Sequence, residues 1–138
     1  MALSVQSIGQ EAEVLNDLDL LILLKMMVEE VRSRPDRYGS LGQIADHWEI
    51  CWEQYGPGTL DLELETVALD SQKKIEFLYL IFIIGRKLCS LGPTLTADTV
   101  NRRWGVRGIE FFDYQTDRLH VTLDKLRALI AGSTAPSS

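Results

Sequence analysis

Residues 18–28 read Leu-Asp-Leu-Leu-Ile-Leu-Leu-Lys-Met-Met-Val, and the fold of the chain follows from this stretch. Apolar side chains occupy nearly every helical face here, which predicts a helix packed on two sides at the centre of its domain. Acidic residues precede the stretch and Arg32 and Arg34 follow it, in agreement with the helix dipole, and Pro35 ends the pattern. We therefore expect a first helix from Glu11 to Ser33.

A second helix is expected after a turn at residues 35–40. Ser40 and Gln43 have the spacing of a capping box, in which each side chain satisfies a backbone N–H of the other residue. The helix then continues to the breaker Gly-Pro-Gly at residues 56–58. Its apolar stripe consists of Ile44, Trp48, Cys51, Trp52 and Tyr55.

The next segment, residues 59–67, alternates apolar and acidic residues with the period of two that is typical of a β-strand. No second strand is evident nearby in the sequence, and a lone strand is not stable. We expect an extended segment or an irregular lead-in to the following helix.

A third helix is predicted from Asp70 or Ser71 to Leu91, where Gly92 followed by Pro93 ends it. Together with the first helix it should form the centre of the domain. The residues expected on its core side are Ile75, Leu78, Tyr79, Phe82, Ile83 and Leu88.

Three shorter patterns make up the C-terminal part. Thr96 is placed to cap a short helix at residues 97–104, and residues 109–114 form an aromatic cluster. A last helix follows, and the alternation of apolar residues at 119–123 leaves a short strand before it as an alternative. The apolar residues of this last helix are Leu119, Leu123, Leu126, Leu129 and Ile130.

These patterns predict a mainly α fold, a single-domain helical bundle of about five helices with a short extended or β segment at 59–67 or 106–122. Residues 1–131 form the domain, and residues 132–138 form a disordered tail of small residues. A chain of 138 residues with 46% hydrophobic residues is sufficient for one core.

The charge of the chain limits its partners. The formal net charge is −6, and the acidic excess lies in the first two-thirds of the sequence. Neutralising the phosphates of a nucleic acid requires clustered Lys and Arg, so a binder with a broad basic face is excluded. The excess acid is either a solvated surface or a surface for a basic partner.

The sequence contains no recognisable catalytic or metal-binding motif. His47 and His120 have no zinc-ligand spacing around them, and Cys51 and Cys89 are expected to be free, buried thiols of a reducing compartment. No signal peptide or membrane-spanning stretch is expected. We therefore expect a cytoplasmic protein that is not an enzyme and needs no cofactor or metal.

One segment offers a nucleic-acid alternative. Residues 96–118 contain a short helix, a Gly turn and a following element, which loosely resembles a helix-turn-helix, and they include Arg102, Arg103, Arg107 and Arg118. The place of the recognition helix is taken by an acidic and aromatic run at 109–114, so DNA binding is the second hypothesis.

Acidic residues cluster around the Gly-Pro-Gly turn and are the candidate partner-binding residues. If they share a face, they would steer a basic protein toward the surface. Trp48, Trp52 or Tyr55 would supply aromatic anchors at its rim, or would belong to the core. The six acidic candidates are Asp46, Glu49, Glu53, Asp61, Glu63 and Glu65.

The turn between the first two helices carries a family resemblance. Residues 31–41 read Val-Arg-Ser-Arg-Pro-Asp-Arg-Tyr-Gly-Ser-Leu, and Trp104 with Phe111 and Phe112 follow later. This order resembles helical immunity proteins of bacterial polymorphic-toxin and contact-dependent growth inhibition systems, specifically over residues 20–55 and elsewhere in outline. The resemblance implies stoichiometric binding of a cognate toxin, and no functional residue carries over by motif.

The sequence thus favours an immunity protein that binds and neutralises a basic toxin domain through its acidic surface. A DNA-binding regulator and a homodimer completed by apolar helices are the remaining hypotheses.

Overall fold

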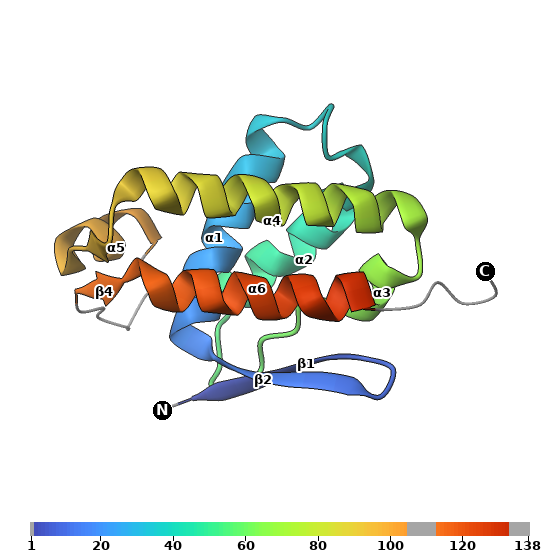
Figure 1. Cartoon of the computed structure of the whole chain (residues 1–138), viewed down its shortest axis with the longest axis horizontal. Helices are drawn as coiled ribbons and strands as arrows, with labels where there is room; N and C mark the ends of the chain where they lie inside the picture. The colour runs from blue at the N-terminus through green and yellow to red at the C-terminus, as the bar shows by residue number, and fades with distance from the viewer. Residues whose placement is uncertain (1, 105–112, 133–138) are drawn as a thin grey trace.

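The computed structural model of the chain describes residues 2–104 and 113–132. Within them it contains six α-helices, a short 3₁₀ helix and two antiparallel sheets of two strands each (Figure 1). The mainly α fold is confirmed, with one helix more than expected. In chain order the elements are β1 (Leu3–Ile8), β2 (Glu11–Asn16), α1 (Asp17–Ser33), the 3₁₀ helix (Gly39–Leu41), α2 (Gly42–Glu53), α3 (Leu64–Ala68), α4 (Ser71–Leu91), β3 (Thr94–Leu95), α5 (Ala97–Trp104), β4 (Tyr114–Gln115) and α6 (Thr116–Gly132).

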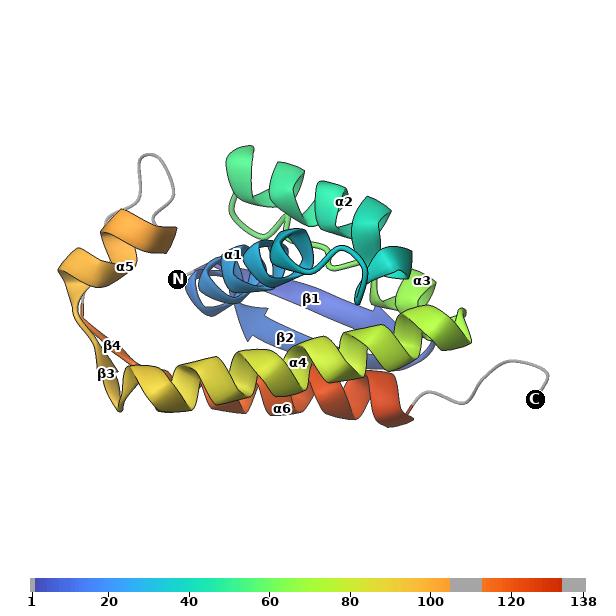
Figure 2. The same cartoon turned by 90° about the horizontal axis from the view of Figure 1, so that it is seen from above.

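Helix α1 lies at the centre of the molecule, as residues 18–28 predicted. Figure 2 shows it between α2 on one side and the pair of α4 and α6 on the other. Burying a large aliphatic side chain contributes about 1.5–3 kcal/mol, so this stretch is a main source of stability. The fully buried run comprises Leu20, Leu21, Ile22, Leu23 and Leu24.

The predicted start of the first helix at Glu11 was wrong, because residues 11–16 form β2. The helix begins where the Asn16 side chain accepts hydrogen bonds from the backbone N–H groups of Leu18 and Asp19, at 2.8 and 3.3 Å. This N-cap satisfies two donors that the first turn of a helix leaves without partners.

β1 and β2 form a hairpin that the sequence analysis did not expect. Its register places Val5 opposite Val14, and the turn uses Gly9 at a φ of 60°. The inner face of β1 is polar, since Ser4 and Gln6 are buried, whereas Val5 and Val14 are exposed. A hairpin that turns polar side chains inward departs from the usual apolar-inward alternation.

The predicted capping box before α2 is not formed. Ser40 lies in the 3₁₀ helix, and its backbone N–H donates to the Glu76 side chain at 3.0 Å. Helix α2 begins at Gly42 without a side-chain cap and ends at Glu53, just before the predicted breaker. The segment at 59–63 is extended and leads into the short helix α3, as expected for residues 59–67.

Helix α4 confirms the predicted bounds but not the predicted core face. Asp70 caps its start by accepting from two backbone N–H groups, and Gly92 follows its end at a φ of 88°. The expected core residues Ile75, Tyr79 and Phe82 are exposed. The middle of the helix, residues 77–84, is apolar on all sides, so the buried face is chosen by its contacts with α1 and α6. The residues it buries are Glu76, Phe77, Leu80, Ile81, Ile84 and Leu88.

The C-terminal elements follow the prediction closely. The Thr96 hydroxyl accepts from the Thr99 N–H at 3.2 Å at the start of α5, and all five apolar residues predicted for α6 are buried. The strand β4 lies inside 106–122, where a β segment was an alternative, but residues 119–123 belong to α6, so a strand at those residues was wrong. β4 pairs with β3, which the sequence did not predict. The aromatic residues at 109–112 and the predicted tail beyond Gly132 lie outside the described residues.

Candidate functional site

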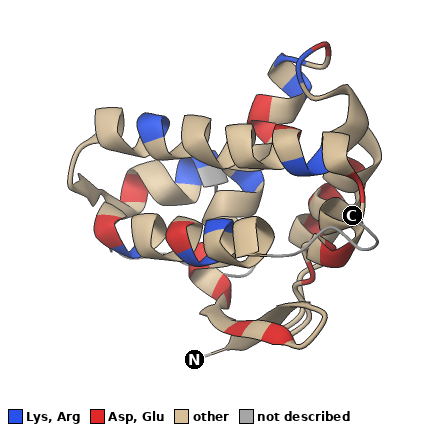
Figure 3. Cartoon of the chain, turned by 45° about the vertical axis from the view of Figure 1, so that its right-hand side comes forward, with Lys and Arg blue, Asp and Glu red and all other residues tan. Residues whose placement is uncertain are grey.

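The six acidic candidates do not form one uninterrupted surface. Asp46 and Glu49 on α2 form ion pairs with Arg32 of α1, the second at 3.7 Å. Figure 3 shows acidic positions spread over the hairpin and several helices and alternating with Lys and Arg. Arg32 therefore offsets part of the negative charge that the sequence assigned to α2.

Three of the candidates project from residues 59–65, called here the acidic segment, which is extended up to Glu63 and continues into the first turn of α3. Asp61 and Glu65 are exposed and Glu63 is half-buried, while the leucines between them point into the core. The period of two seen in the sequence thus separates an acidic outer side from an apolar inner side. Glu53 is exposed at the end of α2, and no ion pair with it occurs among the described residues.

The backbone of this acidic segment is held by side chains of β1 in place of a third strand. The Gln6 amide donates to the Leu60 carbonyl at 2.8 Å and accepts from the Leu62 N–H at 3.0 Å. The Ser4 hydroxyl accepts from the Leu60 N–H at 3.2 Å, and the Trp48 indole donates to the Leu62 carbonyl at 2.9 Å. These buried hydrogen bonds explain why β1 turns its polar side inward.

Asp17 fixes the start of the same segment. Its buried carboxylate accepts from the Tyr55 hydroxyl at 2.6 Å, from the Gly58 N–H at 2.8 Å and from the Ser4 hydroxyl. Gly58 has a φ of 75°, which suits the third position of a turn with Pro57 at the second. One carboxylate thus joins β1, the start of α1, the residues that follow α2 and the Gly-Pro-Gly turn.

Glu63 has a strained backbone in the middle of the acidic segment. It is the one non-glycine residue with a positive φ, 58°, in the described part of the chain. A left-handed conformation costs a residue with a side chain roughly 1–2 kcal/mol. The Glu63 carboxylate lies 3.7 Å from His47 Nε2, and its N–H donates to Asp61 at 2.9 Å.

The predicted aromatic anchors divide between core and rim. Trp48 is fully buried, and its ring packs edge-on against Phe77. Trp52 and Tyr55 are half-buried, with the Lys25 ammonium 4.3 Å from the centre of the Trp52 ring. Trp48 therefore belongs to the core, and only the other two reach the surface.

A thiol and an imidazole lie beside the acidic segment. Cys51 Sγ is 3.4 Å from His47 Nε2, which is also 3.0 Å from the Asp61 carbonyl. Burial raises the pKa of the Cys51 thiol, and the charges of Asp61 and Glu63 raise it further. A reactive cysteine needs a lowered thiol pKa, so this geometry does not activate Cys51.

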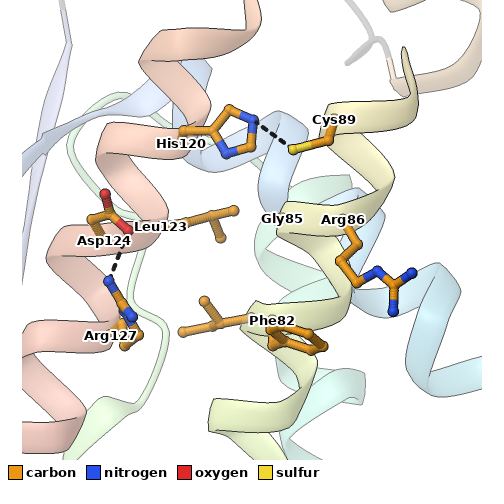
Figure 4. Close-up of a pocket in the computed structure, with 9 residues that line it drawn as sticks. Phe82, Gly85, Arg86, Cys89, His120, Leu123, Asp124 and Arg127 are labelled. Carbon is orange, nitrogen blue, oxygen red and sulfur yellow. Dashed lines mark hydrogen bonds and ion pairs between the residues drawn. The ribbon is translucent and has the colours of Figure 1, made fainter. Parts of the chain in front are cut away.

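The sequence analysis missed a cleft between α4 and α6, which we call the α4–α6 cleft (Figure 4). It has a volume of about 270 Å³. Cys89, predicted to be buried, is exposed at its end with Sγ 3.9 Å from His120 Nε2. Its lining includes Phe82, Gly85 and Arg86 of α4 and His120, Leu123 and Arg127 of α6.

Two basic residues of the alternative DNA-binding segment, Arg102 and Arg118, have acidic partners. Arg102 pairs with Asp98 within α5, and Arg118 lies 3.5 Å from the buried Asp19 of α1. Burial raises the pKa of Asp19, although the positive charge of Arg118 acts against this rise. Arg107 and the proposed turn lie outside the described residues.

No three His, Cys, Asp or Glu side chains among the described residues are grouped so that they could hold a metal ion. None of the helices within residues 2–104 and 113–132 is long and apolar enough to cross a membrane.

Comparison of the chain with models of protein families, with curated proteins and with solved structures finds no match.

Proposed function

We propose that this chain is a non-catalytic cytoplasmic binding protein, an immunity protein that neutralises a basic toxin domain by occupying its surface. The observation that carries the proposal is the acidic segment at 59–65, with its outward carboxylates on a backbone fixed from inside. Ordering a contact segment before binding lowers the entropy that association costs. The resemblance of residues 31–41 supplies the class of partner.

The strain at Glu63 supports a role for its side chain. Glycine would adopt the same φ without the steric cost, so a glutamate here opposes stability at its own position. Strained residues cluster at functional sites, because there the side chain is needed despite the cost.

The resemblance itself has a local structural role. Tyr38, in the Arg-Pro-x-x-Tyr-Gly turn, is buried, and its hydroxyl donates to Glu30 at 2.8 Å. The turn therefore connects α1 to α2 and orients the helix that carries Glu53. In our proposal the turn supports the contact surface and does not itself touch the toxin.

Co-expression with the product of the neighbouring gene tests the proposal. We expect a stable complex of fixed stoichiometry and relief of the toxicity of that product. Absence of a complex, together with undiminished toxicity, would rule the proposal out. A salt-sensitive shift of DNA by the purified chain would instead favour the helix-turn-helix alternative.

Charge reversal locates the contact. Glu53→Lys with Glu63→Lys should slow association with the toxin at low salt, because rim charges mainly change the association rate. Glu29→Lys with Asp36→Lys applies the same change of charge at exposed positions outside the segment and serves as the control. Equal association rates for the two double variants would show that the acidic segment is not part of the interface.

Glu63→Gly separates binding from folding. It should raise the free energy of unfolding by about 1 kcal/mol through release of backbone strain. It should also weaken toxin binding, since the carboxylate is lost. A variant that is both more stable and fully able to bind would mean that Glu63 has no role in binding.

A further inference from the structure

A stripe of exposed apolar side chains follows the outer face of α4. Ile75, Tyr79 and Phe82 are 62%, 38% and 57% exposed and are spaced so that they share one face of a helix. Phe82 also lines the α4–α6 cleft, so the stripe and the cleft form one continuous surface. Figure 1 shows α4 and α6 side by side along most of their length. At one point of the stripe, Arg37 donates a hydrogen bond to the Tyr79 hydroxyl at 2.9 Å.

Gly85 keeps the middle of the cleft open. In a helix interior glycine costs about 1 kcal/mol relative to alanine. Packing does not require it here, because a Cβ at this position would meet only Leu123 Cδ1, at 4.0 Å. Figure 4 shows Leu123 directed across the cleft toward Gly85. Neither helix stability nor core packing therefore explains why the residue at the middle of the α4–α6 cleft is a glycine.

The rim of this surface is basic, although the chain as a whole is acidic. The guanidinium groups of Arg37 and Arg86 lie 5.1 and 5.9 Å from the ring centres of Tyr79 and Phe82. Arg127 and His120 line the other side of the cleft. The acidic side chain in the cleft lining, Asp124, already pairs with Arg127 at 3.1 Å.

The remaining charged groups near the stripe are engaged in the fold. Glu76 is buried and accepts from Ser40 and Gln72, and Lys87 pairs with Glu30 at 2.8 Å. The guanidinium of Arg86 has no carboxylate partner among the described residues. An occupant of this surface therefore meets apolar side chains along its centre and the positive charges of Arg37 and Arg86 beside them.

We propose that the stripe and the α4–α6 cleft together dock an acidic amphipathic helix of a protein partner, with one apolar side chain inserted over Gly85. A groove between two neighbouring helices is a common seat for such a helix, which inserts anchors at every third or fourth residue. The inference rests on the proposed function in that the occupant is a protein. It goes further because the surface lies on α4 and α6, outside the acidic segment, and selects the opposite charge.

Synthetic peptides provide the probe. A fluorescent helical peptide of about 16 residues, roughly four turns, would carry Leu on one face and Glu beside it. Its control would carry Lys in place of Glu. Fluorescence anisotropy at low salt should show the acidic peptide binding about tenfold more tightly. Equal binding of the two peptides would overturn the proposal.

The cysteines report where the peptide binds. Cys89 is exposed at the end of the cleft, whereas Cys51 lies on α2, across α1. Bound acidic peptide should slow alkylation of Cys89 and leave the rate at Cys51 unchanged. Protection of Cys51 alone, or of neither thiol at saturating peptide, would place the binding elsewhere.

Two substitutions at one residue test the role of the cleft. Gly85→Leu should fill it and weaken acidic-peptide binding by about tenfold or more, while Gly85→Ala should retain most of the binding. Circular dichroism of both variants checks that α4 is intact. Unchanged peptide binding by a folded Gly85→Leu variant would contradict the proposal.

Two controls separate this surface from the toxin contact and from self-association. The Glu53→Lys, Glu63→Lys double variant should bind the acidic peptide like the unaltered chain, whether or not toxin binding is lost. Sedimentation should show a monomer. A dimer that Gly85→Leu dissociates would mean that a second copy occupies the cleft, which would refute a separate partner helix.

Discussion

Asp17 shows how one buried carboxylate can organise distant parts of this chain. It is 1% exposed, and its hydrogen-bond donors come from β1, from Tyr55 just after α2 and from the turn at residues 56–59. No sequence pattern distinguishes it from the other acids. Its role follows from contacts with residues more than ten positions away in either direction.

Asp17→Ala should therefore destabilise the fold strongly. Hydrogen bonds to a charged group contribute about 1.5–3 kcal/mol, and the substitution also leaves buried donors without an acceptor. We expect a loss of about 3 kcal/mol in the free energy of unfolding, measured by urea denaturation. Asp36→Ala, at an exposed acid in the turn after α1, should change stability little. Similar losses in the two variants would contradict the assigned role.

The two cysteines should differ in reactivity. Alkylation proceeds through the thiolate, and burial raises the pKa of Cys51 while Cys89 is exposed. Near pH 7, Cys89 should react with a maleimide faster than Cys51, as measured by peptide mapping over time. Faster reaction at Cys51 would indicate that its surroundings stabilise the thiolate instead.

At the scale of elements, the acidic segment depends on the hairpin. The side chain of Gln6 makes the two hydrogen bonds to this segment's backbone that a neighbouring strand would otherwise make. Gln6→Ala should cost about 2 kcal/mol, because two buried bonds to the backbone are lost. Gln10→Ala, in the exposed turn of the same hairpin, is the matched control. Equal stability of both variants in chemical denaturation would show that the hydrogen bonds of Gln6 to the acidic segment do not stabilise the fold.

Helix α4 combines a buried face with an unusual interior glycine. Gly85→Ala should raise the free energy of unfolding by up to about 1 kcal/mol, since it improves helix propensity and meets no close atom. Thermal denaturation followed by circular dichroism measures the change. Destabilisation would show that the backbone at Gly85 or its contact with α6 does not tolerate a Cβ.

Across the whole molecule, acid should weaken the fold partly through Glu30. Burial acts to raise the pKa of Glu30, but hydrogen bonds from Lys87 and Tyr38 and the charges of Lys87 and Arg34 outweigh it and lower the pKa below its ordinary value of 4.5. A group with a lowered pKa in the folded state contributes stability above its unfolded value, and this contribution is lost as the pH falls through the folded value.

Glu30→Gln should therefore reduce stability near pH 7 and make the decline below about pH 4.5 shallower. Urea denaturation over a pH series measures both effects. Glu29→Gln, at the exposed neighbouring residue, should keep the acid dependence of the unaltered chain. If the free energy of unfolding falls with pH in the same way for Glu30→Gln and the unaltered chain, Glu30 does not contribute to the loss of stability in acid.

Local signals identified much of the helical architecture. Asp70 and Gly92 mark the two ends of α4, and Thr96 caps α5, because caps and breakers act on backbone groups within a few residues. The hairpin was missed although residues 3–6 alternate apolar and polar side chains, since its polar side faces inward. The start of α1 was then misplaced, because the acids of β2 are also the residues that the positive N-terminal end of a helix dipole favours.

The candidate site was predictable only in part. The alternation at 59–65 identified which acids point outward, and the charge of α2 was visible in the sequence. The pairing of Asp46 and Glu49 with Arg32 was not, because it joins two helices that meet only after folding. The basic cleft between α4 and α6 depends in the same way on two segments that are separate in the sequence.

The sequence by itself determined that the chain is mainly helical, that residues 18–28 are central, and where α4, α5 and α6 begin or end. These properties depend on composition, periodicity and capping, which act over one or two helical turns. Only the tertiary structure decided which face of α4 is covered and which acids stay unpaired. An apolar face is buried, or a charge neutralised, only when another element packs against it, and no local pattern specifies that neighbour.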